Sequence, residues 1–104
     1  MADINKIIHE RVRLLILTYL AGSDKQEINF NELQTSLELT SGNLSVQLRK
    51  LKEAGYLEIE KTFRDNKPYT TIFITPEGRK ALNQYIEEME SIIGTLRGMK
   101  TEEC

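Results

Sequence analysis

This chain of 104 residues has a single cysteine, Cys104, at its last position. An internal disulfide is therefore excluded, and so is a metal site built from several cysteines. We expect no cofactor, no metal and a reducing, cytoplasmic setting. The first residues lack the uncharged apolar core of a signal peptide, and no segment stays apolar over the length that a membrane span requires. We therefore expect no membrane partner.

The sequence also lacks a group of residues that could carry catalysis. His9 is the only histidine, and Glu10 and Arg11 follow it directly on a predicted helix, so the three side chains do not face the same way. No glycine-rich phosphate loop occurs, and the carboxylates are spread over predicted solvent faces. Because acid–base or nucleophilic catalysis needs convergent groups, the sequence does not predict an enzyme. We expect His9 to be a residue of the helix surface or of an interface.

A large excess of positive charge is absent as well, since the formal net charge is −2. Its distribution is uneven. Residues 40–75 hold six basic and four acidic side chains, whereas residues 1–39 and 76–104 each hold four basic and six acidic ones. The positive surplus is small, and the acidic flanks would weaken nonspecific binding to DNA. The basic segment is nevertheless the one that contains the most informative pattern.

That pattern covers residues 40–57 and predicts a helix followed directly by a strand. Leu44, Leu48 and Leu51 form one apolar stripe, Thr40 can cap the first amides, and Gly55 suits a left-handed stop. The opposite side is thin and rich in hydrogen-bond donors, as a helix that enters a DNA major groove requires. The alternative is a merely solvated polar face, and Gln47 falls beside the apolar stripe. The candidate DNA contacts of this helix are Ser41, Gly42, Asn43, Ser45, Val46, Gln47, Arg49 and Lys50.

The residues before this helix predict two more helices. The first covers residues 3–20, with Asp3 as its cap, and its apolar stripe comprises Ile4, Ile8, Val12, Leu15 and Tyr19. Gly22 follows its end. A short strand at Glu27–Asn29 then precedes a helix over Phe30–Leu37. Because only Glu38 and Leu39 link this helix to the next, the two must cross steeply, which predicts a helix-turn-helix.

A β-hairpin with a charged tip is predicted after Gly55. Its strands are Tyr56–Arg64 and Tyr69–Thr75, and Asp65–Pro68 have strong turn chemistry. Such a tip can reach a phosphate or the minor groove, where arginine is favoured, but charged tips also serve solubility alone. The candidate contacts here are Lys61, Arg64, Asn66, Lys67 and Tyr69.

The last predicted helix begins at Thr75-Pro76 and ends at about Leu96. Its stripe is more apolar than one small body can cover, so we expect two subunits to bury their first and last helices together. The alternative is a helix that folds back onto its own core. The candidate interface residues are Ile4, Ile7, Leu82, Tyr85, Ile86, Met89, Ile92, Ile93 and Leu96. We predict one domain over residues 1–97, with a dimerisation helix at 76–97, and a flexible tail at 98–104.

Three segments together carry a family resemblance. Leu39–Leu57 resembles the recognition helix and following strand of MarR/ArsR-like winged helix-turn-helix regulators, His9–Leu17 is similar to their first helix, and Thr75-Pro-Glu-Gly-Arg79 to the entry into their final helix. The resemblance implies an α+β, mainly α fold with a two- to three-stranded β-wing and a C-terminal dimerisation helix.

The same resemblance implies a function. It implies a homodimer that binds specific sequences in double-stranded DNA and regulates transcription, with repression where the operator overlaps a promoter. The metal-sensing branch of this family uses clustered cysteines or histidines, which the sequence lacks. Nothing polar and convergent marks a site for a small-molecule effector. A winged helix that binds protein without binding DNA stays open as an alternative.

Overall fold

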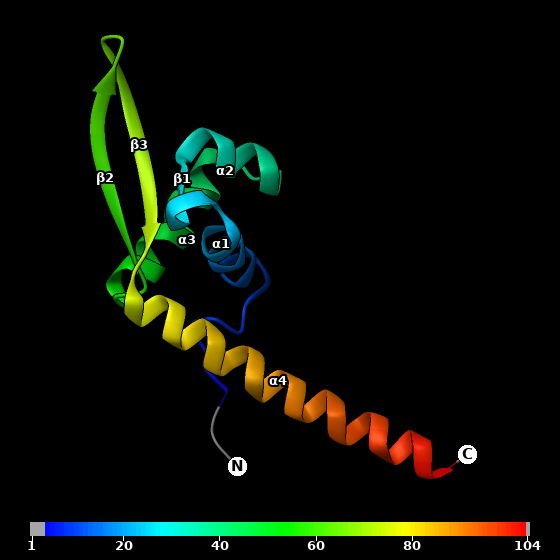
Figure 1. The fold of residues 1–104 in the computed structure, drawn as a ribbon. Coiled ribbons are helices and arrows are strands. Elements are labelled where there is room, and N and C mark those ends of the chain that lie inside the picture. Colours follow the sequence, from blue (N-terminus) through cyan, green and yellow to red (C-terminus); the bar gives the residue numbers. More distant parts are fainter. Residues whose placement is uncertain (1–3, 104) are drawn as a thin grey trace.

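The computed structural model describes residues 4–103, so Asp3 and Cys104 lie outside the described residues. Figure 1 shows a small body from which a β-hairpin and a long helix project in different directions. This is the predicted mainly α winged-helix fold, with a three-stranded antiparallel sheet. Its elements are α1 (Arg11–Gly22), the short 3-10 helix η1 (Asp24–Gln26), β1 (Glu27–Asn29), α2 (Phe30–Leu37), α3 (Ser41–Glu53), β2 (Leu57–Arg64), β3 (Lys67–Ile74) and α4 (Pro76–Glu103).

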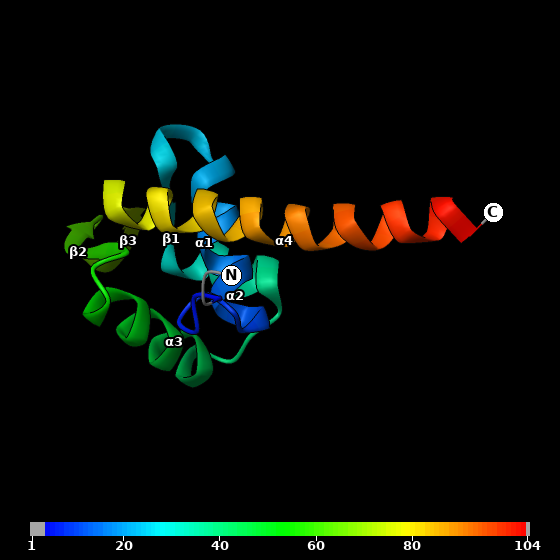
Figure 2. The ribbon, with the colours of Figure 1, turned by 90° about the horizontal axis from the view of Figure 1, so that it is seen from below.

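The hydrophobic core lies where α1, α2, α3 and the start of α4 meet the base of the sheet. The strand order is β1-β3-β2, so the short strand β1 lies at one edge of the sheet and β2 at the other. α1 passes through the middle of the body in Figures 1 and 2. The fully buried side chains come from α1, α2, α3, β2, β3 and the segment before α1: Ile8, Ile16, Leu17, Leu20, Leu33, Leu44, Leu51, Leu57 and Ile72.

The first helix is shorter than the sequence predicts, because it begins at Arg11 instead of near residue 3. Glu10 caps it: its carboxylate accepts hydrogen bonds from the amides of Val12 and Arg13. Asn5 forms a separate turn, since its side-chain oxygen accepts hydrogen bonds from the amides at positions 7 and 8, and its amide donates to the hydroxyl of Tyr56 at 2.9 Å. These polar contacts hold residues 4–10 in a non-helical path.

The predicted apolar stripe of this helix was also partly wrong. Tyr19 is 42% exposed, and Leu15 is only partly buried. The buried residues of α1 are Ile16, Leu17 and Leu20. The stripe failed because it assumed one continuous helical period from Ile4, whereas that period starts only at residue 11.

The tip of the wing is tighter than expected. The connection between β2 and β3 has two residues, Asp65 and Asn66, with φ values of 52° and 63°. Positive φ at both central positions gives a turn whose twist matches that of the flanking strands, and aspartate and asparagine tolerate it best after glycine. Lys67 and Pro68, predicted as turn residues, therefore pair with Arg64 and Phe63 in the ladder.

The base of the wing is fastened to the start of α4. The Thr75 hydroxyl donates to the carbonyl of Gly55 at 2.6 Å and accepts a hydrogen bond from the amide of Gly78 at 2.9 Å. Gly78 is buried against the backbone of Tyr56, so closely that an added Cβ would collide with the Tyr56 carbonyl. Only glycine fits here, and this contact fixes the angle between the wing and α4.

The last helix is longer than predicted, since α4 continues past Leu96 to Glu103. Figure 2 shows it extending well beyond the body, and every side chain from Glu90 to Gly98 is exposed. That residues 98–104 form a flexible tail stays a prediction. In the part of the chain that the structure describes, no helix combines the length and apolarity needed to cross a membrane.

Candidate nucleic-acid interface

Helix α3 has the caps and the buried face that its sequence predicts. The hydroxyl of Thr40 accepts a hydrogen bond from the amide of Asn43 at 3.1 Å, and Gly55 adopts a φ of 83° just beyond the helix. Glu38 adopts a left-handed φ of 54° in the turn from α2, which lets the two helices cross. Leu44, Leu48 and Leu51 are the buried residues of α3 and attach it to the core.

The side of α3 opposite these leucines is open to solvent. It exposes hydroxyl, amide and cationic groups over most of its length, as direct contact with base edges and phosphates requires. Gly42 adds no side chain there, and an added Cβ would meet no atom within 4 Å. The predicted contact residues that are exposed on this helix are Ser41, Gly42, Asn43, Ser45, Val46, Arg49 and Lys50.

Gln47 differs from the other predicted contacts of α3, because its amide is already engaged within the protein. Its side-chain oxygen accepts a hydrogen bond from Arg13 Nη1 at 2.8 Å, and its nitrogen donates to Asn43 Oδ1 at 3.3 Å. It is also only partly exposed. Its position fits a side chain that holds α3 against α1 better than one that is free to contact a base.

Arg13 is the partner that makes this attachment, and no local pattern in the sequence indicates its role. Its Nε donates to the carbonyl of Ile7, and Nη1 lies 3.9 Å from the carboxylate of Glu10. The arginine side chain is only 13% exposed. One guanidinium thus joins the segment before α1, the α1 cap and α3, which fixes α3 relative to the core.

Glu10 lies in an electropositive environment at the same junction. Burial raises the pKa of its carboxyl, but the amides of Arg13 and Val12 and the charges of Arg13 and Lys50 oppose this. Together they hold the pKa of Glu10 below its ordinary value of 4.5. The carboxylate is therefore ionised in the folded protein near neutral pH, where it caps α1.

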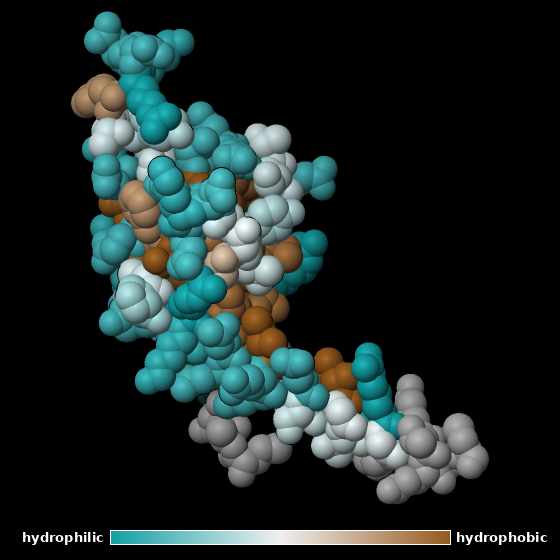
Figure 3. Space-filling view, in the orientation of Figure 1, coloured by the Kyte–Doolittle hydropathy of each residue, from teal (hydrophilic) through white to brown (hydrophobic). Residues whose placement is uncertain are grey.

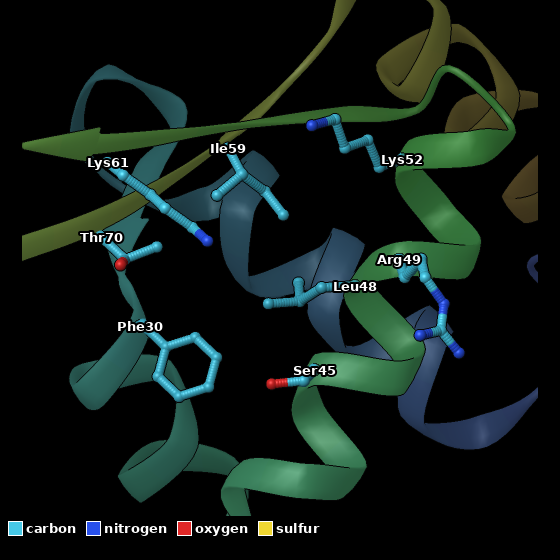
Figure 4. Close-up of a pocket in the computed structure, with 8 residues that line it drawn as sticks. All are labelled: Phe30, Ser45, Leu48, Arg49, Lys52, Ile59, Lys61 and Thr70. Atoms are coloured by element: carbon cyan, nitrogen blue, oxygen red, sulfur yellow. The ribbon is translucent and has the colours of Figure 1, made fainter.

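A groove of about 760 Å³ separates α3 from the wing. Its floor is apolar. Its sides carry hydroxyl and cationic groups from α3, β2 and β3, and α2 contributes the ring of Phe30. Figure 4 shows the amines of Lys52 and Lys61 extending into this space, whereas the guanidinium of Arg49 turns away from it. Arg49 instead lies 3.9 Å from Glu53, one helical turn along. The groove is lined by Phe30, Ser45, Leu48, Arg49, Lys52, Ile59, Lys61 and Thr70.

Lys52 was missed as a candidate, although the sequence contained a signal for it. It follows Ser45 by seven residues and Arg49 by three, so it lies on the same side of α3 as both. Phe30 could not be found in this way. Its place in the groove depends on the pairing of β1 with β3, which brings the start of α2 beside the wing.

The wing tip carries its cations on two faces of the hairpin. Lys61 pairs with Thr70 on the groove side, whereas Arg64 pairs with Lys67 on the other face. The guanidinium of Arg64 lies over the ring of Tyr69, 4.1 Å from its centroid, which is a cation–π arrangement. Tyr69 thus holds Arg64 in place, and the predicted wing residues Lys61, Arg64, Asn66 and Lys67 are all exposed.

The predicted interface residues, from α4 and from the segment before α1, divide into two groups. Leu82 and Tyr85 are 3% and 6% exposed and belong to the protomer's own core, and Ile4 and Met89 pack against that core. Figure 3 shows apolar side chains gathered where α4 leaves the body. The predicted residues that stay exposed are Ile7, Ile86, Ile92, Ile93 and Leu96, at 38% to 53%.

His9 lies at the inner end of this apolar surface. Its Nδ1 is 2.7 Å from the hydroxyl of Tyr85, and the two rings are tilted at 44°. The contact joins the segment before α1 to α4. Among the side chains of residues 4–98, no three histidines, cysteines, aspartates or glutamates come together as a possible metal site.

Comparison with known proteins indicates a winged-helix family. The sequence model of a family described as a winged helix DNA-binding domain matches residues 12–93. An uncharacterised protein of Methanocaldococcus jannaschii, MJ0432, is 42% identical over 84 residues, which cover 81% of this chain and 89% of that protein.

Solved structures have the same fold. A transcriptional regulator homologue from Pyrococcus horikoshii superposes with a TM-score of 0.77 at 27% identity, over 86% of this chain and 87% of its own. A MarR family transcriptional regulator from Streptomyces coelicolor, Sco3205, solved in complex with DNA, superposes with a TM-score of 0.66 at 19% identity. That match covers 88% of this chain and 67% of the regulator.

Proposed function

Because this chain belongs to the winged helix DNA-binding domain family and is MarR-like in fold, we propose that it is a sequence-specific regulator of transcription that binds double-stranded DNA as a homodimer. The observation that carries the proposal is the placement of the polar side of α3 beside a groove with cations on both walls. The family is one of DNA-binding proteins and not of enzymes. In the proposed complex, α3 enters the major groove and the wing lies over the neighbouring backbone.

Each part of the surface has a chemical role in this arrangement. Amides and hydroxyls at the start of α3, including Ser41, suit a phosphate, because a helix N-terminus carries partial positive charge. Asn43 can read an adenine edge once its Oδ1 leaves the amide of Gln47, and Arg49 can read a guanine edge once it leaves its exposed pairing with Glu53. Such an exposed pair costs little to break.

The groove suits the DNA backbone that runs between the major-groove contact and the wing. Lys52 on α3 and Lys61 on β2 both extend into it. A phosphate between these amines would be attracted by both, and release of its counterion would add affinity that is independent of sequence. Arg64 and Lys67 at the tip would contact the next phosphates or the minor groove.

The homodimer is supported by the part of α4 that projects from the body. Ile86, Ile93 and Leu96 are 40%, 44% and 53% exposed, with Ile92 at 44% beside them. Spacings of seven and three along α4 keep the first three on one side of the helix, where a second copy can bury them. In such a dimer, a two-fold axis would relate the two α4 helices. The two α3 helices would then lie about 34 Å apart, which is one turn of DNA.

Repression is the sign of control that we propose, for an operator that overlaps a promoter. A bound dimer would then cover the sequence that the polymerase needs. The alternative function is a winged helix that binds protein without DNA, and the overall acidity of the chain favours it, since the net charge is −2. The surplus of positive charge in residues 40–75 favours DNA instead.

Selection of bound sequences from random duplex DNA tests the proposal. We expect a consensus with two inverted half-sites about ten base pairs apart, because each α3 would read one half-site. Recovery of a single half-site would contradict the homodimer but keep DNA recognition. Failure to enrich any sequence, with the folded protein shown by its melting transition, would contradict sequence-specific binding and favour the protein-binding alternative.

A further inference from the structure

Phe63 is the most exposed large apolar side chain in the described part of the protein. Its ring is 75% exposed, whereas the next, Leu96 on α4, is 53% exposed. It lies near the end of β2, one residue before Arg64 and two before the turn. Alternation along the strand puts it on the same side as Leu57 and Ile59, but the hairpin extends so far from the body that the side chain stays exposed.

The strand pairing shows what Phe63 lies beside. Ile59 and Lys61 line the groove, and alternation along β2 places Phe63 on the same face, one step further from the core. Its partner across the hairpin is Pro68. On the groove-facing side of the wing, the buried Leu57 thus lies at the base, Lys61 lies further out, and the apolar pair Phe63 and Pro68 lies near the tip.

The charges around this apolar pair indicate the chemistry of its partner. Arg64 and Lys67 follow it at the tip, Lys61 precedes it, and Asp65 is the one acidic residue among positions 61–68. A duplex offers this combination, because the minor groove presents apolar sugar surface between two rows of phosphates. Proteins that bind there combine arginine or lysine with an apolar wedge, often phenylalanine or proline. An apolar protein partner alone would gain nothing from the surrounding cations.

We infer that Phe63 enters the minor groove of the bound duplex as an apolar contact of the wing, with Pro68 beside it and Arg64 and Lys67 at the phosphates. The inference rests on the proposed DNA-binding function and adds to it a contact that carries no charge. The wing then reads the width of the minor groove, in addition to attracting its phosphates.

The experiment compares wild type, Phe63→Ala and Phe63→Leu on a selected duplex, together with Arg64→Ala. We expect Phe63→Ala to bind roughly tenfold more weakly, because it loses the burial of an aromatic ring, and Phe63→Leu to lose less. The salt dependence of binding should stay that of wild type for both, since neither change removes a charge. Arg64→Ala should lower the salt slope by about one contact. Equal melting temperatures check that the exposed ring is not needed for folding.

Hydroxyl-radical footprinting then locates the contact, because the radical attacks sugars from the minor groove. Wild type should protect sugars flanking the α3 site, and Phe63→Ala should lose that protection at the wing positions alone. Wild-type affinity of Phe63→Ala would overturn the inference, as would weaker binding with the flanking protection intact. Failure of wild-type protein to bind any duplex would instead overturn the proposed function and with it this contact.

Discussion

The wing and the outer half of α4 both project from the body, but they expose opposite chemistry. Between Lys61 and Lys67 the wing exposes cations and hydrogen-bonding groups around one aromatic ring. From Ile86 to Leu96 the helix exposes four large apolar residues, interspersed with glutamates. Figure 3 shows this contrast between the hydrophilic wing tip and the apolar start of the projecting helix.

Exposure alone does not define the partner of a projecting surface. A cationic projection gains free energy from a polyanion through counterion release, whereas an apolar one gains it by leaving water. Both projections start at one junction, where Thr75 and Gly78 tie α4 to the end of α3 and the start of β2. We therefore expect that a substitution on one projecting surface leaves the other surface functional. A substitution at the junction should impair both.

The largest expected effect comes from a charge on the apolar side of α4. Ile93→Glu should weaken self-association by at least about 100-fold, because a carboxylate would be buried in the proposed interface without a partner. Analytical ultracentrifugation across a range of protein concentrations measures it. Ser91→Glu is the matched control, since it places the same charge on the opposite side of the helix. Equal dimer populations of the two variants would contradict the proposed interface.

The next effect is expected at the junction itself. Gly78→Ala should lower the free energy of unfolding by about 1–3 kcal/mol, because the added methyl collides with the Tyr56 carbonyl and forces the backbone apart. Urea denaturation followed by circular dichroism measures the change. Gly94→Ala lies on the same helix with nothing within 4 Å of an added Cβ and should be neutral or stabilising. A Gly78→Ala protein as stable as wild type would show that the wing and α4 are not held as described.

A smaller effect, on DNA binding and not on dimerisation, is expected from substitutions in the groove between α3 and the wing. The double variant Lys52→Gln, Lys61→Gln should bind duplex DNA roughly tenfold more weakly near 0.1 M salt and dimerise normally. Fluorescence anisotropy with a labelled duplex measures the affinity. Lys25→Gln removes a cation from η1, which lies across the body from α3 in Figure 2, and serves as the control. Indistinguishable affinities of the two proteins would exclude a phosphate from the groove.

The smallest effect concerns the attachment of α1 and depends on pH. Glu10→Gln weakens the cap of α1 and should cost about 1 kcal/mol of stability at neutral pH. Because the folded pKa of Glu10 is lowered, its contribution is present above 4.5 and is lost as the pH falls through the lower folded value. Thermal melts of wild type and variant should therefore converge in acid. Glu87→Gln, an exposed change on α4, is the control, and a constant gap between wild type and Glu10→Gln down to low pH would contradict the charge's role.

Local signals in the sequence predicted α2 and α3 well. Phe30–Leu37 and the end of α3 just before Gly55 agree with the structure, because caps and the three- and four-residue spacing of leucines are local properties. The first helix was predicted too long, since nothing local shows that Asn5 contacts Tyr56, 51 residues away. The helical spacing of apolar residues continues through residues 4–10, but tertiary contacts hold these residues in a non-helical path.

Some features of the candidate site could likewise be predicted from local signals, and others could not. Exposure of Ser45, Arg49 and Lys50 could be predicted from the helix period. The attachment of Gln47 by Arg13 could not, because it depends on how α1 crosses α3. Nor could the exposure of Phe63, whose alternation predicts an inner face but not how far the hairpin extends beyond the body.

The salt dependence of duplex binding is the decisive measurement for the proposal that α3, the groove and the wing form one DNA-binding surface. The logarithm of the wild-type association constant should fall linearly with the logarithm of salt concentration, by about 0.9 for each phosphate contacted. The double variant Lys52→Gln, Lys61→Gln should reduce that slope by about 0.9, because the groove holds one of those phosphates. A wild-type affinity that is insensitive to salt, or a slope that the double variant leaves unchanged, would contradict the account.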